Sequence, residues 1–238
     1  LDGPEASLFC LVDGTTVVPL LPAQDFKRVG DGDAGPNTGG MGAYSPLPWL
    51  DGPTEARIWD VVASTVRALR EEGIAYAGLL YTGVMLTPGG PKVLEYNCRF
   101  GDPETQVVVP RLRGDLAEAL GACAADRLAD VKVDLSEDAA VTVVLASGGY
   151  PGPFPTGRPI EGLAVAAATP DAVVFHSGTA ERDGRVVTAG GRVLAVTGWG
   201  PAVADARLRA YEAASHISFD GSTRRSDIAA RAAEGGST

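Results

Sequence analysis

The chain has 238 residues, of which 45% are hydrophobic and 21% are charged, and its formal net charge is -10. This length and composition are typical of a globular protein with one large or two modest domains. The negative charge argues against a nucleic-acid partner or an anionic membrane surface, since both need a basic footprint. The three cysteines form no C-x-x-C pair, and no apolar run in the sequence is long enough to span a bilayer. We therefore expect reduced thiols, no zinc, and a cytoplasmic location.

The hydrophobic pattern predicts a series of strands and helices. Apolar runs joined by turn residues predict hairpins, and apolar residues at helical spacing predict helices. In the first half of the chain, the sequence predicts a hairpin over residues 6–20, a helix over 54–72 capped by Thr54, and a hairpin over 76–97. A helix is then predicted from Asp102; Pro110 interrupts it, and it resumes over 115–125. The second half predicts strands over 140–146 and 173–176, a hairpin of 185–188 with 192–197, and a helix over 201–215 whose inward residues are Val203, Leu208 and Tyr211.

A boundary between two units is predicted near residues 126–138, a charged stretch with no long apolar run. We expect one unit over residues 1–128 and a smaller, mostly β unit over residues 129–238. Together the predicted elements indicate the α+β class.

Residues 22–48 lack regular periodicity and predict a long loop. Such a loop inside a compact domain is usually either functional or disordered. Its aromatic residues, its glycines and the pair Lys27-Arg28 favour a ligand-binding loop, in which glycine amides approach the ligand closely. The alternative is a surface loop in which Asp31 and Asp33 simply pair with these two basic residues.

Residues 93–104 carry the clearest chemical signal. In an extended strand Glu95, Asn97 and Arg99 share one face. A carboxylate and an amide oxygen at this spacing suit a magnesium ion that takes its other ligands from phosphates and water. The guanidinium of Arg99 then offers a planar fork for a phosphate or carboxylate. The alternative is that the first two residues are merely solvated and that Arg99 pairs with Asp102.

The other residues of this stretch predict packing and a helix start. Leu94, Tyr96 and Cys98 should face the protein interior. Asp102 is a good N-cap and Pro103 suits the first helical position, so the strand should run into a helix N-terminus that can bind an anion.

The two histidines give no support to a hydrolase triad. His176 lies at a predicted strand end beside a glycine. A structural hydrogen bond is the favoured interpretation of this residue, and a substrate contact is the alternative.

Three segments resemble the phosphoribosylamine–glycine ligase family of the ATP-grasp superfamily: residues 24–46, residues 92–106, and Gly190-Gly-Arg-Val-Leu194. The resemblance covers the chain in order. It implies the second half of an ATP-grasp domain, an antiparallel sheet with packed helices, followed by a small β-rich C-terminal domain. The family's first substrate domain and the half that closes over adenine are then expected before Leu1.

The resemblance also implies a reaction. ATP would phosphorylate glycine to glycyl phosphate, and 5-phosphoribosylamine would attack it to give glycinamide ribonucleotide, ADP and phosphate in purine synthesis, with Mg²⁺ or Mn²⁺ bound. Glu95 and Asn97 match the metal ligands of the family, and Arg99 would contact the γ-phosphate or the acyl phosphate. Lys27 is a second candidate catalytic residue. The candidates for holding substrate or phosphate are Asp25, Arg28, Asn37, Thr38, Gly39, Gly40 and Asp102.

Two departures from the family pattern matter. Many ATP-grasp enzymes have a further acidic metal ligand about a dozen residues before the Glu-x-Asn strand, but residues 80–84 contain no acid. Phe26 stands where a histidine is expected, which removes a catalytic histidine there. The alternative functions are another ATP-grasp carboxylate–amine ligase, or a catalytically silent module that binds magnesium and nucleotide.

Overall fold

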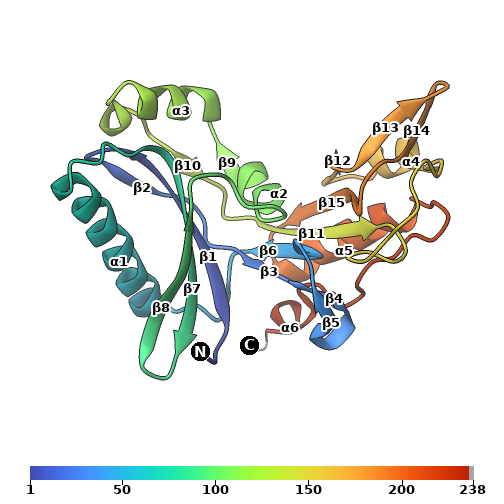
Figure 1. Cartoon of the computed structure of the whole chain (residues 1–238), viewed down its shortest axis with the longest axis horizontal. Coiled ribbons are helices and arrows are strands. Elements are labelled where there is room, and N and C mark those ends of the chain that lie inside the picture. Colours follow the sequence, from blue (N-terminus) through green and yellow to red (C-terminus); the bar gives the residue numbers. More distant parts are fainter. Residues whose placement is uncertain (236–238) are drawn as a thin grey trace.

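The computed structural model describes residues 1–235 (Figure 1). Two antiparallel sheets, each covered by helices, form two lobes that meet near β3, β6 and α2. This arrangement confirms the predicted α+β class. None of the helices in residues 1–235 is long and apolar enough to cross a membrane.

The first sheet has the strand order β2-β1-β7-β8. It consists of β1 (Glu5–Asp13), β2 (Val17–Pro19), β7 (Ala77–Thr87) and β8 (Gly90–Asn97), and it is flanked by α1 (Gly52–Glu71) and α3 (Leu116–Ala124). Cys10 and Val12 of β1 pack with residues of α1, while Phe9 and Leu11 pack with residues of α3. Burial on both faces explains why this strand is a continuous apolar run rather than an alternating one. Both hairpins predicted for this part of the chain are confirmed.

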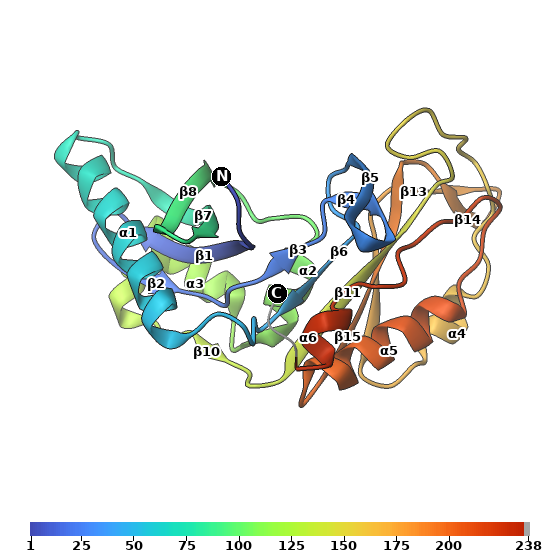
Figure 2. The same ribbon diagram turned by 90° about the horizontal axis from the view of Figure 1, so that it is seen from below.

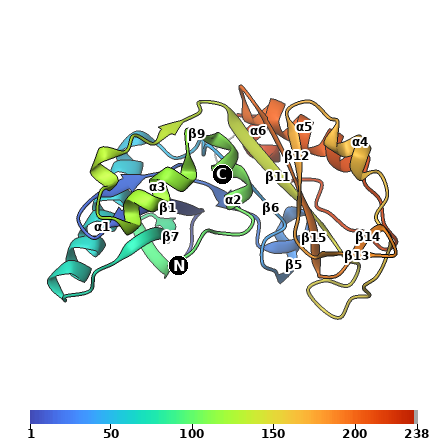
Figure 3. The same ribbon diagram turned by 90° about the horizontal axis from the view of Figure 1, so that it is seen from above.

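The second sheet has the order β12-β15-β11-β6-β3. Its central strand β11 (Ala139–Ala146) is buried along its whole length. The helices α4 (Leu163–Ala167) and α5 (Val203–Ser215) lie on one face of the sheet, and the hairpin of β4 (Arg28–Gly30) and β5 (Ala34–Asn37) lies on the other (Figures 2 and 3). The remaining elements are β3 (Gln24–Asp25), the 3-10 helix Asp31–Asp33, β6 (Gly42–Ser45), α2 (Thr105–Val108), the 3-10 helix Val109–Arg111, β9 (Leu112–Arg113), the 3-10 helix Leu128–Asp130, β10 (Asp134–Leu135), β12 (Ala172–His176), β13 (Thr179–Arg182), β14 (Arg185–Thr188), β15 (Arg192–Gly200) and α6 (Ala230–Ala233).

The two sheets are joined where β3 passes β1. Ser7 and Ala23 form an antiparallel bridge, and Gln24 Nε2 donates to the carbonyl oxygen of Glu5 at 3.1 Å. Because β3 also pairs with β6, and β6 pairs with β11, both strands belong to the second sheet, although they precede β11 by about a hundred residues. The predicted division into 1–128 and 129–238 stays a prediction, and the last three residues of the second unit lie outside the described residues.

The prediction of a single long loop over residues 22–48 is wrong. The segment contains four short strands, of which β6 is fully buried. The reason is that Ala43 pairs with Thr142 of the buried strand β11, a long-range contact that local composition does not reveal.

The predicted cap of the first long helix is also wrong. The N-cap is Asp51, whose carboxylate accepts from the amide of Thr54 at 2.7 Å. Both residues are good caps, and Pro53 suits the first turn of a helix that begins at Gly52.

The predicted hairpin of residues 185–188 with 192–197 is wrong, because β14 pairs with β13 and β15 pairs with β11 and β12. Asp183 and Gly184 join β13 to β14, and both have positive φ, as a two-residue hairpin turn of type I′ requires. On α5, Val203 is buried as predicted and Tyr211 packs against the core, but Leu208 is 62% exposed and does not face inward.

Candidate functional site

The end of β8 presents the two predicted metal ligands side by side. Asn97 Nδ2 donates to Glu95 Oε1 at 3.1 Å, so the two side chains share a face as the strand period predicts. Opposite them across the ladder lie Tyr81 and Gly83, so no acid faces the pair from β7. Within residues 1–235 no group of three or more His, Cys, Asp or Glu side chains is placed to hold a metal.

This donor set fits a magnesium ion of a particular kind. A carboxylate and an amide oxygen are hard ligands, and Mg²⁺ commonly keeps several waters and binds phosphate oxygens for the rest. Glu95 is exposed and Asn97 is half-buried, so both are open to a ligand that brings those phosphates.

The opposite side of β8 does not pack into a core as predicted. Leu94 and Tyr96 are each 40% exposed, and the Tyr96 hydroxyl reaches Thr65 of α1 at 2.7 Å. Cys98 is exposed as well. The pairing of β7 with β8 is irregular here, because Val93 pairs with Val84 whereas Glu95, two residues further on, pairs with Gly83, only one residue away from Val84.

Arg99 is exposed beyond the strand, and its Nη1 donates to the carbonyl oxygen of Phe100 at 2.9 Å. The alternative in which Arg99 pairs with Asp102 is therefore wrong. The carboxylate of Asp102 accepts instead from Arg192 Nη2 at 2.9 Å and from Gln106 Nε2 at 2.9 Å.

These contacts also explain why no helix begins at Asp102. The helix α2 begins at Thr105 with Glu104 as its N-cap, and it has only four residues. The carboxylate of Asp102 is occupied by side chains rather than by helix amides, so the predicted anion site at a helix N-terminus is not formed here.

Lys27 lies among carboxylates at the junction of the two sheets. Its ammonium group forms an ion pair with Glu5 of β1. Burial acts to lower the pKa of Lys27, but Glu5, Asp25 and Glu95 together outweigh it and raise this pKa above its usual value. Lys27 therefore stays charged, and it lies near enough to Glu95 of β8 for that carboxylate to act on its pKa.

Asp25 is a second titratable group whose pKa this environment changes. Burial and the nearby charge of Glu104 raise the pKa of Asp25 to about 7, although Lys27 acts in the opposite direction. Glu104 is 5% exposed and accepts from Ser7 Oγ at 3.0 Å, and its own pKa is raised mainly by burial. Two carboxyl groups thus lie in a poorly solvated place beside one lysine.

The turn of residues 37–40 is bound within the protein. Gly39 N–H donates to the Tyr150 hydroxyl at 3.0 Å, and Gly40 N–H donates to Thr38 Oγ1 at 2.9 Å. The Thr38 hydroxyl in turn donates to the Lys27 carbonyl oxygen at 2.8 Å. The amides of Gly39 and Gly40, which were predicted to approach a ligand, therefore already donate hydrogen bonds within the protein.

Arg28 and Asn37 face each other across the β4–β5 hairpin, and both are exposed. Arg28 Nη1 donates to the carbonyl oxygen of Gly35 at 2.8 Å. The alternative in which Asp31 and Asp33 pair with Lys27 and Arg28 is wrong. Asp31 accepts from the backbone and the hydroxyl of Ser226, and Asp33 pairs with Arg225 at 2.7 Å.

Arg225 is a buried cation that sequence reasoning missed. Its side chain is 1% exposed and forms two hydrogen bonds to Asp227 at 2.7 Å, besides the pair with Asp33. Its Nη1 also donates to the Arg28 carbonyl oxygen at 3.1 Å, and its guanidinium lies 4.9 Å from the centre of the Phe26 ring. The phenyl ring that replaces the expected histidine thus packs against this cation.

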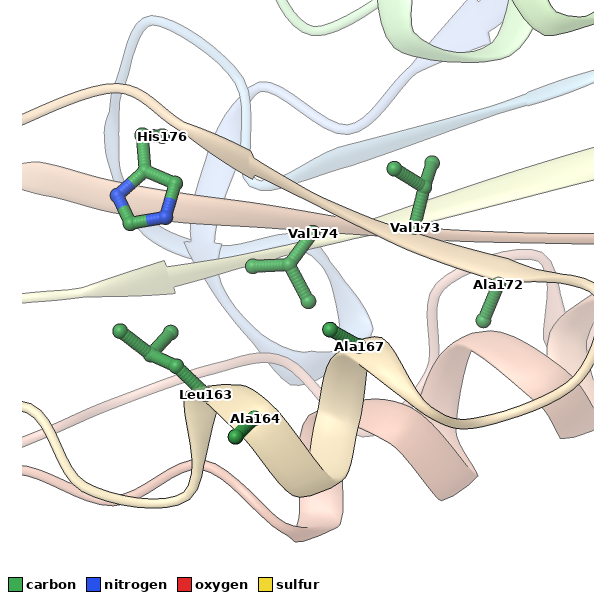
Figure 4. A pocket seen from close by; sticks show the side chains of 7 residues that line it. All are labelled: Leu163, Ala164, Ala167, Ala172, Val173, Val174 and His176. Atoms are coloured by element: carbon green, nitrogen blue, oxygen red, sulfur yellow. The ribbon is translucent and has the colours of Figure 1, made fainter.

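His176 forms a hydrogen bond between Nδ1 and Thr179 Oγ1 at 3.0 Å. Its ring lies at one end of a pocket between α4 and β12 whose other lining residues are apolar (Figure 4). This hydrogen bond agrees with the structural interpretation.

The residues that sequence reasoning missed differ in how visible they were. Arg192 lies inside the Gly-Gly-Arg segment that carries the family resemblance, so a signal was present. Glu5 and Arg225 gave none, because each acquires its partners only through the tertiary fold.

Comparison with known proteins extends this description. The family model described as the phosphoribosylglycinamide synthetase ATP-grasp (A) domain matches residues 1–105, and the model of the C domain of the same synthetase matches residues 140–231. The phosphoribosylamine–glycine ligase of Streptomyces coelicolor is 54% identical over 237 residues, which cover 98% of this chain and 57% of that protein.

Solved structures give the same picture. The crystal structure of phosphoribosylamine–glycine ligase from Thermotoga maritima has a TM-score of 0.82 and 39% identity, covering 96% of this chain and 56% of that one. The biotin carboxylase domain of Hydrogenobacter thermophilus 2-oxoglutarate carboxylase has a TM-score of 0.65 at 16% identity, with 93% of this chain and 47% of that one covered, and this likeness concerns the fold alone.

The fold and these matches define a protein of the ATP-grasp class. Within that class, the two family models describe two domains of one enzyme and match this chain in order. The chain belongs to the phosphoribosylglycinamide synthetase (phosphoribosylamine–glycine ligase) family. It spans about half the length of the curated relatives it matches.

Proposed function

We propose that this chain takes part in the ATP-dependent ligation of glycine to 5-phosphoribosylamine through glycyl phosphate, giving glycinamide ribonucleotide, ADP and phosphate in purine synthesis. Besides the family membership, one observation supports the proposal. Lys27, in the segment after β3, pairs with Glu5 and lies near enough to Asp25 and Glu95 for their charges to raise its pKa, so its positive charge is available beside the residues that would hold metal and phosphate.

In the first step a glycine carboxylate oxygen forms a bond to the γ-phosphorus of ATP, and the bond to ADP breaks. Arg99 offers a planar guanidinium to the phosphoryl oxygens, and Lys27 adds a second positive charge. Glu95 and Asn97 would hold Mg²⁺ or Mn²⁺, which neutralises phosphate charge when bound. Positioning and charge stabilisation carry most of the catalysis of such a transfer.

In the second step the amine nitrogen bonds to the acyl carbon, and the carbon–oxygen bond to phosphate breaks, so that phosphate leaves with the electron pair. The amine must lose a proton. Asp25 is the group best suited to accept it, because its pKa is raised to about 7 and general bases work best near the operating pH. Arg28, Asn37, Thr38, Gly39, Gly40 and Asp102 remain candidates for holding substrate.

The proposed substrates are small molecules, and the net charge of -10 does not suit a nucleic-acid partner. We also propose a cytoplasmic location. The thiols of Cys10, Cys98 and Cys123 are free, which suits a reducing compartment.

The test is ADP release by the full-length product of the gene, measured with and without glycine and 5-phosphoribosylamine. Glu95→Gln should abolish amide formation at ordinary magnesium and leave the fold intact, as judged by circular dichroism and the thermal midpoint. Arg99→Lys should also be costly, because an ammonium group cannot reproduce a bidentate fork. Glu118→Gln, on the exposed side of α3, is the matched control and should be fully active.

The contrary outcomes are distinct. Near wild-type turnover by Glu95→Gln would remove the metal assignment. ADP release that depends on an acid other than glycine would indicate a different ATP-grasp ligase, and binding of Mg-ATP without any amide product would indicate a silent binding module.

A further inference from the structure

Arg192 lies where the start of β15 meets the turn at Gly39–Gly40 and the turn at Asp102. It is the first residue of β15 and pairs in register with Ala146, the last residue of β11. Its side chain is only 20% exposed. From the second lobe it extends to the turn that follows β8 and to the turn before β6, so it touches segments that come from both sheets.

The guanidinium of Arg192 uses its donors on four acceptors. Nη1 donates to the carbonyl oxygens of Gly39 at 2.5 Å, Asp102 at 2.9 Å and Gly40 at 3.4 Å. Nη2 donates to Asp102 Oδ2 at 2.9 Å. A planar fork is suited to such divergent acceptors, whereas a single ammonium group cannot reach all of them with comparable geometry.

The turn at Gly39 and Gly40 lies so close to Arg192 and Pro103 that a larger residue at either glycine would meet these side chains. A Cβ atom on Gly39 would lie 2.9 Å from Arg192 Cζ. A Cβ on Gly40, which has φ +108°, would lie 2.4 Å from Cδ of Pro103. The two turns and the arginine therefore interlock, and the glycines of this motif serve close packing.

The two turns carry the chemistry on which the proposed function depends. The residue after Pro103 is the buried Glu104, and the chain before Asp102 carries Glu95 and Asn97 at the end of β8 and Arg99 just beyond it. The Gly39–Gly40 turn is linked through Thr38 to the carbonyl oxygen of Lys27. Through these links the guanidinium joins the segment bearing Lys27 to the segment that would hold phosphate.

We propose that Arg192 is a positioning residue that sets the distance between residues 95–99, at and just beyond the end of β8, and the segment of Asp25 and Lys27. This inference rests on the proposed ligation. It assigns Arg192 no contact with substrate. Its role is to keep the acyl phosphate, once formed, within reach of the attacking amine.

The inference predicts a loss of coupling between the two half-reactions. If the two segments drift apart, ATP still phosphorylates glycine, but water replaces the amine. The water oxygen bonds to the acyl carbon, the carbon–oxygen bond to phosphate breaks so that phosphate leaves with the electron pair, the water gives up a proton, and glycine is regenerated. More than one ADP is then formed per amide. A displacement of about 1 Å can cost on the order of a hundredfold in rate.

The experiment compares Arg192→Lys and Asp102→Asn with the wild type in the full-length gene product, measuring kcat for amide formation, KM for ATP, and the ratio of ADP to amide. Arg192→Lys should lower kcat by about ten- to a hundredfold, leave the KM for ATP within about twofold, and raise the ratio above one. Asp102→Asn keeps the shape of the contact and should move the ratio in the same direction by less. Arg158→Lys, which alters an exposed pair with Asp220 at 3.4 Å in the same lobe, is the control and should keep a ratio of one.

A wild-type kcat and a ratio of one in Arg192→Lys would overturn the positioning role while leaving the proposed function in place. An equal fall in amide and ADP formation, with the ratio still at one, would also overturn it, because this result indicates general damage rather than separation of the two steps. Failure of the wild type itself to form the amide would overturn the proposed function, and the inference with it.

Discussion

The buried guanidinium of Arg225 gives the sharpest test of how the site is held together. We expect Arg225→Met to destabilise the protein markedly although the residue lies outside the proposed chemistry. Methionine fills similar space and can keep contact with the Phe26 ring, so the change removes charge and hydrogen bonds rather than volume. It leaves Asp227 and Asp33 without their shared partner.

The magnitude follows from burial. Removing one partner of a buried ion pair typically costs ~3–5 kcal/mol. Asp33 is 68% exposed and is screened by water, whereas Asp227 is 29% exposed, so the lower end of the range applies, about 3 kcal/mol. For a chain of this size that corresponds to a fall in the thermal midpoint of roughly 6–12 °C.

Thermal unfolding followed by circular dichroism measures this fall, and Arg209→Met provides the matched control. Arg209 pairs with Glu212 at 3.0 Å on the exposed side of α5, with side chains 39% and 44% exposed. An exposed pair contributes ~0–1 kcal/mol, so the control should barely change the midpoint. A fall in Arg225→Met no larger than that of the control would refute the reasoning.

Hydrogen exchange should locate the effect of the same variant. The amide of Gly32 donates to Asp227 Oδ2 at 2.8 Å, and the amide of Ser226 donates to Asp31 Oδ1 at 2.8 Å. Both amides should exchange faster in Arg225→Met, because Asp227 loses its partner and because Asp31 lies on the same 3-10 helix as Asp33, the second carboxylate that Arg225 holds. Unchanged exchange at both would show that the segment is held by other contacts.

Two further predictions concern the same junction. The pKa of Asp25 is raised from 3.8 to about 7, so between pH 3.8 and about pH 7 the folded state binds more protons than the unfolded state. The contribution of Asp25 to the free energy of unfolding is therefore present at low pH and is lost as the pH rises through this range. The thermal midpoint of Asp25→Asn should therefore rise relative to that of the wild type between pH 5 and pH 8. A difference between the two midpoints that does not change with pH would contradict the raised pKa. Gly40→Ala should cost about 2–4 kcal/mol in urea unfolding, because φ is +108° and the new methyl group would meet Pro103, whereas Gly52→Ala on α1, where a Cβ has nothing within 4 Å, should be close to neutral. Equal stability of the two alanine variants would count against the close packing.

The sequence predicted the elements whose burial leaves a local pattern. β1 and β11 are covered on both faces and appear as continuous apolar runs, and α1 shows helical spacing. Where two local signals compete, the pattern alone cannot decide. Gly190-Gly191 and Asp183-Gly184 are both plausible turns, and only the tertiary pairing of β15 with β11 settles which one closes a hairpin.

For the candidate site as well, local contacts could be predicted from the sequence and long-range contacts could not. Glu95 and Asn97 could be placed together because strand alternation is a local rule. The ion pairs of Lys27 with Glu5, Arg192 with Asp102, and Arg225 with Asp33 join residues 22, 90 and 192 positions apart. With 20 basic and 30 acidic residues in the chain, unlike charges at such separations cannot be matched from spacing.

The arrangement of these pairs also explains how a glycine-rich segment can act as a rigid part of a site. Ordering such a segment costs much conformational entropy, because glycine is the residue that loses most freedom on folding. Residues 25–40 are held at three points that belong to different parts of the fold: by Glu5 of β1, by Arg192 of β15, and by Arg225 near the C-terminal end. Each contact is charged and therefore stronger than a neutral hydrogen bond. The side chains of Asp25 and Lys27 are thus positioned by both sheets before any substrate arrives, which is what the proposed ligation, with two successive steps at one place, would require.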